Sequence, residues 1–320
     1  MTEYEAVRDG GAGLIDLSAV RGRIRVNGSE ATMFLNGLMT NDMKALAENR
    51  WMLSVFPTVQ GRLIGAVRVI RERDSSFLID TETASHEAVL KTISRFTLAG
   101  DFKVSDVTSE TALLTVQGQG AAEILDNSFE QAASDLPQNG VVQTTWQNVP
   151  VTIIRASHTG EDGFDIVIES SRKAELQQAL ETAGAQAIGE DTFEILRVEA
   201  GIASFGQDMD ETNVVPETNL DEAVSYTKGC YVGQEIIVRI KHRGHVAKKL
   251  TGLRFETDQQ VEAGAVIRSI ENQEIGHVTS AVVSPRRGSI GLGYVRYEHL
   301  AEGTRVVVGD GIEAIVGFNG

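Results

Sequence analysis

Reactive and polar side chains are concentrated in one short stretch of the sequence, Lys228 to Glu235. This octapeptide, KGCYVGQE, holds the only cysteine of the chain together with a lysine, a tyrosine, an amide, a carboxylate and two glycines. Core strands are rarely so polar, and a surface loop seldom carries the one cysteine of a protein. The pattern therefore favours a segment that presents its side chains to a ligand or a partner.

Cys230 is the strongest candidate for chemistry in the octapeptide. A thiol acts as a nucleophile or a metal ligand in its thiolate form, which the nearby positive charge of Lys228 would favour. The alternative is a small buried hydrophobic residue, the commonest setting of a free cysteine. The six histidines show no zinc-ligand spacing, so we expect no metal site made by this chain alone; at most Cys230 shares a metal or a cluster with a partner.

A glycine-rich acidic turn and an arginine-bearing helix are the other candidate binding elements. In the turn from Thr159 to Phe164, a carboxylate can accept two parallel N–H bonds from an amino-pyrimidine ring, although Asp and Gly are also ordinary turn residues. The guanidinium of Arg197 can clamp a carboxylate tail or form an ordinary ion pair. The basic stretch from Arg239 to His245 is either a guide for an anionic polyglutamyl tail or a charged linker.

Length and charge limit the possible functions. A chain of 320 residues is expected to form two or three packed modules. No apolar run approaches the roughly 20 residues that span a bilayer, and no secretory signal is visible. With a single cysteine, these features predict a cytoplasmic protein without membrane contact. The net charge of −16 argues against direct nucleic-acid binding, although six Lys or Arg between Lys228 and Lys249 leave room for a local positive patch.

Hydrophobic periodicity predicts an α+β body. A strand at residues 23–26 is followed by a helix that we expect Ser29 to cap, and the pattern of residues 26–35 returns at residues 116–125. We infer an internal duplication of two related α+β units. Asp191 and Glu194 have capping-box spacing and predict a helix start, with Arg197 off its apolar face. Further strands are expected at 63–71, 77–80, 101–107, 151–156 and 164–168, and helices at 83–97, with Phe96 on its apolar face, and from about 172 to 184.

The C-terminal part has a different residue pattern. Six short β-rich runs separated by glycine or polar turns follow Lys249, which predicts a small β-barrel. We therefore expect a body at residues 1–245, made of two related α+β units, and a barrel at residues 246–320.

Together these segments resemble the glycine-cleavage T-protein (aminomethyltransferase) superfamily, and the octapeptide resembles the signature of its YgfZ-type folate-binding branch. The resemblance covers nearly the whole chain. Its landmarks are the opening unit of Leu14–Ser18 and Phe34–Asp42, the turn Thr159–Phe164, the helix Leu196–Gly201, and the octapeptide with Arg239–Ile240 and Arg243–Val246.

The resemblance implies a fold and a ligand. The fold is a cloverleaf of two intertwined α+β domains plus a C-terminal small β-barrel, around an opening that binds tetrahydrofolate or a derivative. Glu161 would bind the pterin edge and Arg197 the distal part of the folate, with Tyr231 and Gln234 as further folate contacts. Lys228 and Cys230 would carry the special chemistry of the branch.

The resemblance also implies a function. Members of the branch are associated with assembling or maintaining iron–sulfur clusters in particular enzymes, including tRNA-modifying ones. We therefore expect a folate-binding accessory protein with Cys230 as its key thiol and iron–sulfur client enzymes or cluster-assembly proteins as partners. Whether it turns over a substrate stays open.

Two alternatives remain, a folate-dependent one-carbon (aminomethyl) transferase and a non-catalytic binding module. True aminomethyltransferases carry an Asp pair on the strand where this chain has Gly65 and Ala66. A carboxylate that handles protons near the reacting nitrogen is typically worth roughly 10²–10⁴ in rate. We therefore expect negligible aminomethyl transfer.

Overall fold

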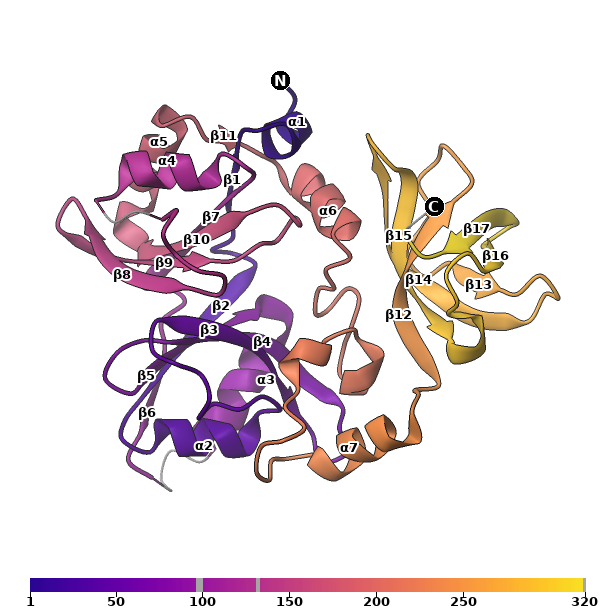
Figure 1. Ribbon diagram of the computed structural model, residues 1–320, viewed down its shortest axis with the longest axis horizontal. Helices are drawn as coiled ribbons and strands as arrows, with labels where there is room; N and C mark the ends of the chain where they lie inside the picture. Colours follow the sequence, from indigo (N-terminus) through magenta and orange to yellow (C-terminus); the bar gives the residue numbers. More distant parts are fainter. Residues whose placement is uncertain (96–99, 131–132, 319–320) are drawn as a thin grey trace.

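The computed structural model describes residues 1–95, 100–130 and 133–318. These residues form two α+β domains and a closed β-barrel (Figure 1). The first domain has an antiparallel sheet in the order β3-β4-β5-β2-β6 and two helices. Its elements are β2 (Arg21–Asn27), α2 (Ala31–Leu38), β3 (Arg50–Pro57), β4 (Leu63–Arg71), β5 (Ser76–Glu82), α3 (Thr83–Ser94) and β6 (Lys103–Asp106).

The second domain repeats this arrangement. Its sheet has the order β11-β1-β7-β10-β9-β8, so β7, β8, β9 and β10 occupy the places of β2, β3, β4 and β5. Its elements are β1 (Gly13–Asp16), β7 (Thr111–Gln117), α4 (Ala121–Ser128), β8 (Val141–Trp146), β9 (Val149–Arg155), β10 (Gly163–Glu169), the 3₁₀ turn η1 (Ser170–Arg172), α5 (Lys173–Thr182) and β11 (Gln186–Ala187). The two sheets thus share one strand order, which is the arrangement that an internal duplication would produce.

The two domains exchange their first strands. β1 precedes the first domain in sequence but pairs with β7 of the second, and β6 precedes the second domain but pairs with β2 of the first. The exchanged strands end alike, since Asp16 accepts the backbone N–H of Ser18 and Asp106 that of Thr108. The α+β domains are therefore intertwined, as the sequence predicted.

Helix starts in the first domain differ in part from the prediction. Ser29 does not cap α2, because its hydroxyl donates to Asp101 at 2.7 Å and the helix begins after Glu30 without a side-chain cap. The reason is the exchange of strands, which brings the segment before β6 beside the start of α2. The expected continuation of α3 through Phe96 and Thr97 lies outside the described residues.

The start of α6 (Glu190–Glu199) is capped from a distant helix. The predicted capping box of Asp191 and Glu194 is wrong, because the N-cap residue is Gly189 and no local side chain caps the helix. Glu3 of α1 (Glu3–Arg8) instead accepts the backbone N–H of Gly189 at 2.8 Å and the hydroxyl of Thr192 at 2.7 Å. A carboxylate at a helix N-terminus is stabilised by the free N–H groups and the helix dipole.

An irregular segment and the short helix α7 (Gln234–Arg243) connect α6 to the barrel. The segment contains the 3₁₀ turns η2 (Val215–Glu217) and η3 (Asp221–Ala223). All six predicted barrel strands are confirmed, in the closed order β12-β15-β14-β13-β16-β17. They are β12 (Lys248–Phe255), β13 (Val266–Arg268), β14 (Glu274–Ser284), β15 (Gly288–Arg296), β16 (Arg305–Val308) and β17 (Ile312–Val316), with η4 (Tyr297–His299) after β15.

The barrel packs on the body through α6. Val198 of α6 belongs to a buried cluster with Leu250, Val282 and Tyr294 of the barrel. Helix α6 therefore joins the barrel to the second domain. Within the described ranges, no helix is long and apolar enough to cross a membrane.

Replacing Glu3 with Ala should lower the free energy of unfolding by about 1 kcal/mol, because α6 loses its only side-chain cap among the described residues. The pKa of Glu3 lies below its ordinary value because the Gly189 N–H and Thr192 donate to its ionised form. The stabilisation should therefore be complete above about pH 4.3 and should decline below it. Urea unfolding at pH 7 measures the difference.

Asp191→Ala is the matched control for this prediction. It removes a carboxylate from the first turn of the same helix, so it loses only the dipole interaction and should cost less than half as much. An equal or larger cost for Asp191→Ala would support the capping box that the sequence suggested.

Candidate functional site

A cavity lies between the two α+β domains and the segment after α6. It has two lobes of about 300 and 290 Å³ that share Arg21, Glu82, His158, Ile202 and Ala203. The first lobe is also lined by Phe193, Arg197 and Phe205, and the second by Trp51, Leu53, Ala66, Arg68, Met209 and Asn219. Apolar and aromatic walls with a few convergent polar groups are typical of a small-molecule site.

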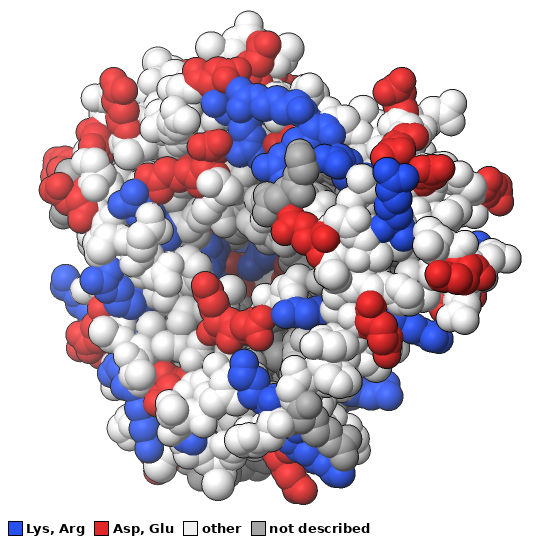
Figure 2. Space-filling view, turned by 45° about the vertical axis from the view of Figure 1, so that its right-hand side comes forward, with Lys and Arg blue, Asp and Glu red and all other residues white. Residues whose placement is uncertain are grey.

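The space-filling view agrees that the molecule is hollowed. Figure 2 shows a depression near the centre of one face, with both basic and acidic side chains visible inside it. The chain as a whole is strongly acidic, so the presence of basic groups in a depression is a local feature.

A chain of buried ion pairs runs beside the cavity from one domain to the other. Arg21 of β2 binds Asp80 of β5 with Nη2 and Oδ2 2.8 Å apart, and Arg68 of β4 binds the same oxygen at 2.6 Å. Arg68 also binds Asp165 of β10, whose carboxylate is shared with His158 at 3.0 Å. Asp80 and Arg68 belong to the first domain, and Asp165 and His158 to the second.

Both carboxylates of this chain are held in the ionised form. Burial by itself raises the pKa of Asp165, but Arg68 and His158 bring it well below its ordinary value. Burial likewise raises the pKa of Asp80, and Arg21 and Arg68 lower it. Each buried carboxylate therefore has two cationic or hydrogen-bonding neighbours, the condition under which a buried charge is tolerated.

Strand β4 contributes no acid to the cavity. A Cβ atom on Gly65 would lie 2.6 Å from Val89 Cγ2, so position 65 faces α3 and has no room for a carboxylate. Ala66 lines the second lobe, as does Arg68 two residues later on the same face of the strand. Of the two positions, only 66 could present a side chain to a ligand, and there the chain has a methyl group.

Arg197 lines the first lobe, but its guanidinium is occupied. It binds Glu194 at 2.7 Å, Asp208 at 2.6 Å and the Ser280 hydroxyl at 2.9 Å, and it donates to the Ile202 carbonyl. Arg197 is nevertheless only 6% exposed, because these polar partners surround it where α6 meets barrel strand β14. Its contact with folate stays a prediction.

Glu161 lies on the side of its turn that faces α1. Its carboxylate accepts Nη1 of Arg8 at 2.9 Å, and Arg8 Nη2 also binds Glu199 at 2.6 Å. Glu161 does not line either described lobe of the cavity, whereas His158, which directly precedes the turn, lines both. The predicted pterin contact would require the carboxylate to leave Arg8, and it stays a prediction.

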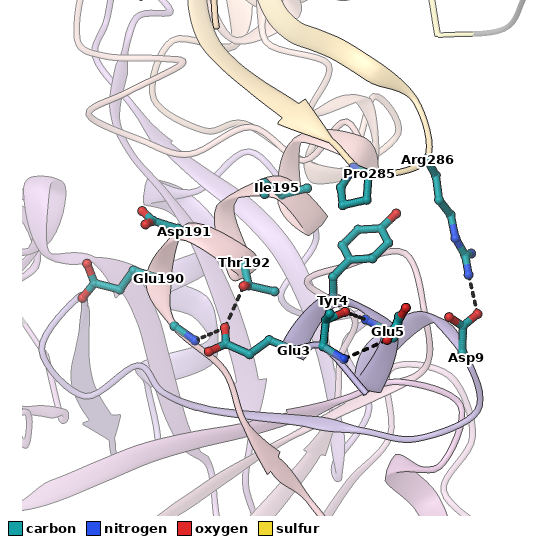
Figure 3. Close-up of a pocket in the computed structure, with 12 residues that line it drawn as sticks. Glu3, Tyr4, Glu5, Asp9, Glu190, Asp191, Thr192, Ile195, Pro285 and Arg286 are labelled. Carbon is teal, nitrogen blue, oxygen red and sulfur yellow. Dashed lines mark hydrogen bonds and ion pairs between the residues drawn. The ribbon is translucent and has the colours of Figure 1, made fainter. Parts of the chain in front are cut away.

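A wide groove beside α1 is occupied by contacts that hold this helix in place. Figure 3 shows Glu3 directed at the start of α6 and Arg286 of the β14–β15 turn directed at Asp9. Glu5 is used as well, since it accepts the Thr2 backbone N–H at 2.8 Å. The groove measures about 1030 Å³, but two of its carboxylates, Glu3 and Asp9, hold the N-terminal helix against α6 and the barrel, and a third, Glu5, caps that helix.

The octapeptide lies at the end of α2, and none of its residues lines either described lobe. Lys228 Nζ donates to the carbonyls of Asn36, Met39 and Asn41 at 2.6–2.8 Å, and burial lowers its pKa to about 8. These three acceptors match the three N–H groups of an ammonium ion. Lys228 therefore anchors the loop to α2, and its predicted effect on the Cys230 thiol stays a prediction.

The other residues of the octapeptide differ in exposure. Cys230 is exposed, Tyr231 is buried against the Lys228 ammonium 5.1 Å from its ring, and Gln234 is the first residue of α7. The Tyr231 hydroxyl is buried without a hydrogen-bond partner among the described residues, and burial raises its pKa to about 12. The predicted folate contacts of Tyr231 and Gln234 stay predictions.

The predicted site residues thus lie in three places: Arg197 at the cavity, Glu161 beside α1, and the octapeptide at the end of α2. The sequence reasoning missed His158, Arg21, Arg68 and Trp51, which line the cavity. The only local signal was the position of His158 directly before the acidic turn. Among the described residues, no group of three or more His, Cys, Asp or Glu could hold a metal ion.

Both parts of the chain match domains of known proteins. Residues 1–228 match the GCVT N-terminal domain, and residues 248–313 match the glycine cleavage T-protein C-terminal barrel domain. An aminomethyltransferase of Rubrobacter xylanophilus is 32% identical over 92% of this chain and 78% of its own length. Another, from Shouchella clausii, is 28% identical over 96% of this chain and 84% of its own length.

A solved structure supports the same grouping. The glycine cleavage system aminomethyltransferase T of Bartonella henselae superposes with a TM-score of 0.90 at 25% identity, over 98% of this chain and 87% of the other. The α+β body and the barrel therefore have the same arrangement in both proteins.

Asp165→Asn should lower the free energy of unfolding by about 3 kcal/mol at pH 7, because it leaves a buried guanidinium with one acceptor fewer. The native pKa of Asp165 is depressed, so its contribution is present above the unfolded value of about 3.9 and is lost as pH falls below it. The difference between wild type and variant should shrink by about 1 kcal/mol at pH 3. Urea unfolding at both pH values measures it, and a pH-independent difference would contradict the ion-pair assignment.

Proposed function

Because the chain belongs to the glycine-cleavage T-protein family, we propose that it binds a tetrahydrofolate in the interdomain cavity and exchanges one-carbon units with it there. The observation that carries the proposal is the cavity itself, which is lined by both α+β domains and has an aromatic side chain or pair in each lobe. Trp51 in one lobe and Phe193 and Phe205 in the other offer surfaces for flat rings.

The relatives favour transfer over the accessory role that the sequence suggested first. Both compared sequences are named aminomethyltransferase, and both cover more than nine tenths of this chain. The neutral side chain of Ala66 counts against a transferase that relies on a carboxylate of β4. Transfer in this cavity therefore needs a proton-handling group from another element.

A second candidate is a folate-binding accessory protein of the YgfZ type that supports iron–sulfur clusters in client enzymes, including tRNA-modifying ones. Its support is the exposed thiol of Cys230 on a loop that Lys228 anchors to α2. An anchored, exposed thiol is suited to meeting a partner protein, and the nearby acid-poor stretch up to Lys249 would favour an acidic partner surface.

Calorimetric titration with tetrahydrofolate under reducing conditions tests the cavity. Wild type should bind with micromolar affinity, about −8 kcal/mol. Ala203→Leu adds bulk to a residue shared by both lobes and should weaken binding at least tenfold. Ala301→Leu makes the same change at an exposed barrel position and should bind like wild type. Equal affinity of all three proteins would place the ligand outside this cavity.

Cys230→Ser distinguishes the two candidate functions. If the protein transfers one-carbon units in the cavity, ammonia release from an aminomethylated carrier protein should depend on tetrahydrofolate and should be within twofold of wild type in the variant, because Cys230 lies outside the described cavity lining. Absence of folate-dependent release by wild type, with loss of iron–sulfur enzyme activity in cells that carry only the variant, would favour the accessory role.

A further inference from the structure

His158 presents its imidazole to the cavity from the second domain. It lines both lobes of the cavity, and Ala66 and Arg68 also line the second lobe. Its backbone N–H donates to Gln117 Oε1 at 2.8 Å, and its ring centre lies 6.0 Å from that of Phe193. The side chain is therefore held in a defined position at the wall of the cavity.

Asp165 holds one nitrogen of this ring. His158 Nε2 lies 3.0 and 3.1 Å from the two carboxylate oxygens of Asp165, which is fully buried. An ionised carboxylate can only accept, so Nε2 carries the hydrogen and Nδ1 of the neutral ring has a free electron pair. Nδ1 has no hydrogen-bond partner among the residues that the structure describes. A carboxylate that fixes the tautomer of a histidine while its other nitrogen faces a substrate is the arrangement of acid–base catalysis.

We propose that His158, oriented by Asp165, is the proton-transfer group of this cavity. The inference rests on the proposed function, since it assumes a tetrahydrofolate bound there. Nδ1 takes the proton of a folate N–H, whose electron pair stays on the folate nitrogen to bond the one-carbon unit. The imidazolium then gives this proton to the departing amine, so that the ring returns to its neutral form and no oxidant or reductant is consumed.

The surroundings suit a histidine that changes its charge. The imidazolium formed in the first step lies against the ionised Asp165, which offsets its charge. The charged groups that face or adjoin the ring from other elements include both signs, with more anions than cations. The cations are Arg21, Arg68 and Arg197, and the anions are Asp80, Asp165 and Glu82, with Glu194 and Asp208 paired to Arg197.

The pair of His158 and Asp165 also supplies the proton-transfer group that β4 lacks. Ala66 and His158 line the same lobe. A ligand in that lobe meets no carboxylate at position 66, but it lies in the space that the imidazole also lines. The second domain therefore contributes the proton acceptor, because β4 of the first domain offers none.

Calorimetry of tetrahydrofolate binding in two buffers of different ionisation enthalpy, from pH 5.5 to 8.5, tests the inference. Wild type and His158→Gln should differ in the number of protons exchanged on binding, because an amide cannot take the proton that the imidazole accepts. His86→Gln is the control, because His86 makes the same contact with Asp106 at 3.0 Å and lines neither lobe; it should behave like wild type.

The rate provides a second readout. Folate-dependent ammonia release should fall roughly 10²–10⁴-fold in kcat in His158→Gln with KM little changed. Wild-type proton exchange and rate in His158→Gln would overturn the inference while leaving the folate site intact. Failure of wild type to bind tetrahydrofolate would overturn the proposed function and the inference with it.

If His158→Gln does not bind folate, a measurement on the wild-type protein tests the inference instead. The imidazole C2–H resonance of His158 should move when tetrahydrofolate is added, because the ring lies at the wall of the cavity. An unchanged resonance at saturating folate would overturn the inference.

Discussion

The buried ion-pair chain between the two α+β domains is the interaction on which the rest of the structure depends. Arg21, Asp80, Arg68, Asp165 and His158 follow one another from the first sheet to the second. Burying such charges is costly unless every group is paired, so the chain is stable in one relative position of the domains. Because three of its members line the cavity and the other two bind one of those three, the same contacts fix the shape of the candidate site.

Polar contacts extend this order to the barrel and to the N-terminal helix. Arg197 joins α6, the following loop and barrel strand β14 through Glu194, Asp208 and Ser280. Two residues later in the same helix, Glu199 accepts from Tyr4 and Arg8 of α1 and from Ser284 of the barrel. The three units are therefore linked by buried, mutually satisfied groups, which is the condition for a cavity that is formed before its ligand arrives.

Elements that depend on local sequence were predicted well. The barrel strands, the duplicated strand–helix units and most strands of both sheets follow from the alternation of apolar residues, which is a property of neighbouring positions. Features that depend on remote partners were missed. Ser29 and Asp191 have the right types to cap helices, but Asp101 and Glu3 arrive from elsewhere in the chain and change the outcome.

The site shows the same division between local and remote information. The acidic turn and the octapeptide were visible as motifs, yet the structure places Glu161 against Arg8 and anchors Lys228 to α2. The cavity residues come from strands that are 59 to 97 positions apart, as in the pairs of Arg21 with Asp80 and Arg68 with Asp165, so no local pattern marks them. Strand pairing within the first sheet brings Arg21 and Arg68 to Asp80, and the contact between the two domains brings Arg68 to Asp165.

We infer that the ion-paired domains enclose the ligand site of this family member. A crystal structure of the chain with bound tetrahydrofolate tests this inference. We expect ligand density between Trp51, Ala66 and His158, with the ion pairs of Arg68 to Asp80 and Asp165 intact. Density beside Cys230 or in the groove of α1, with the interdomain cavity empty, would contradict it.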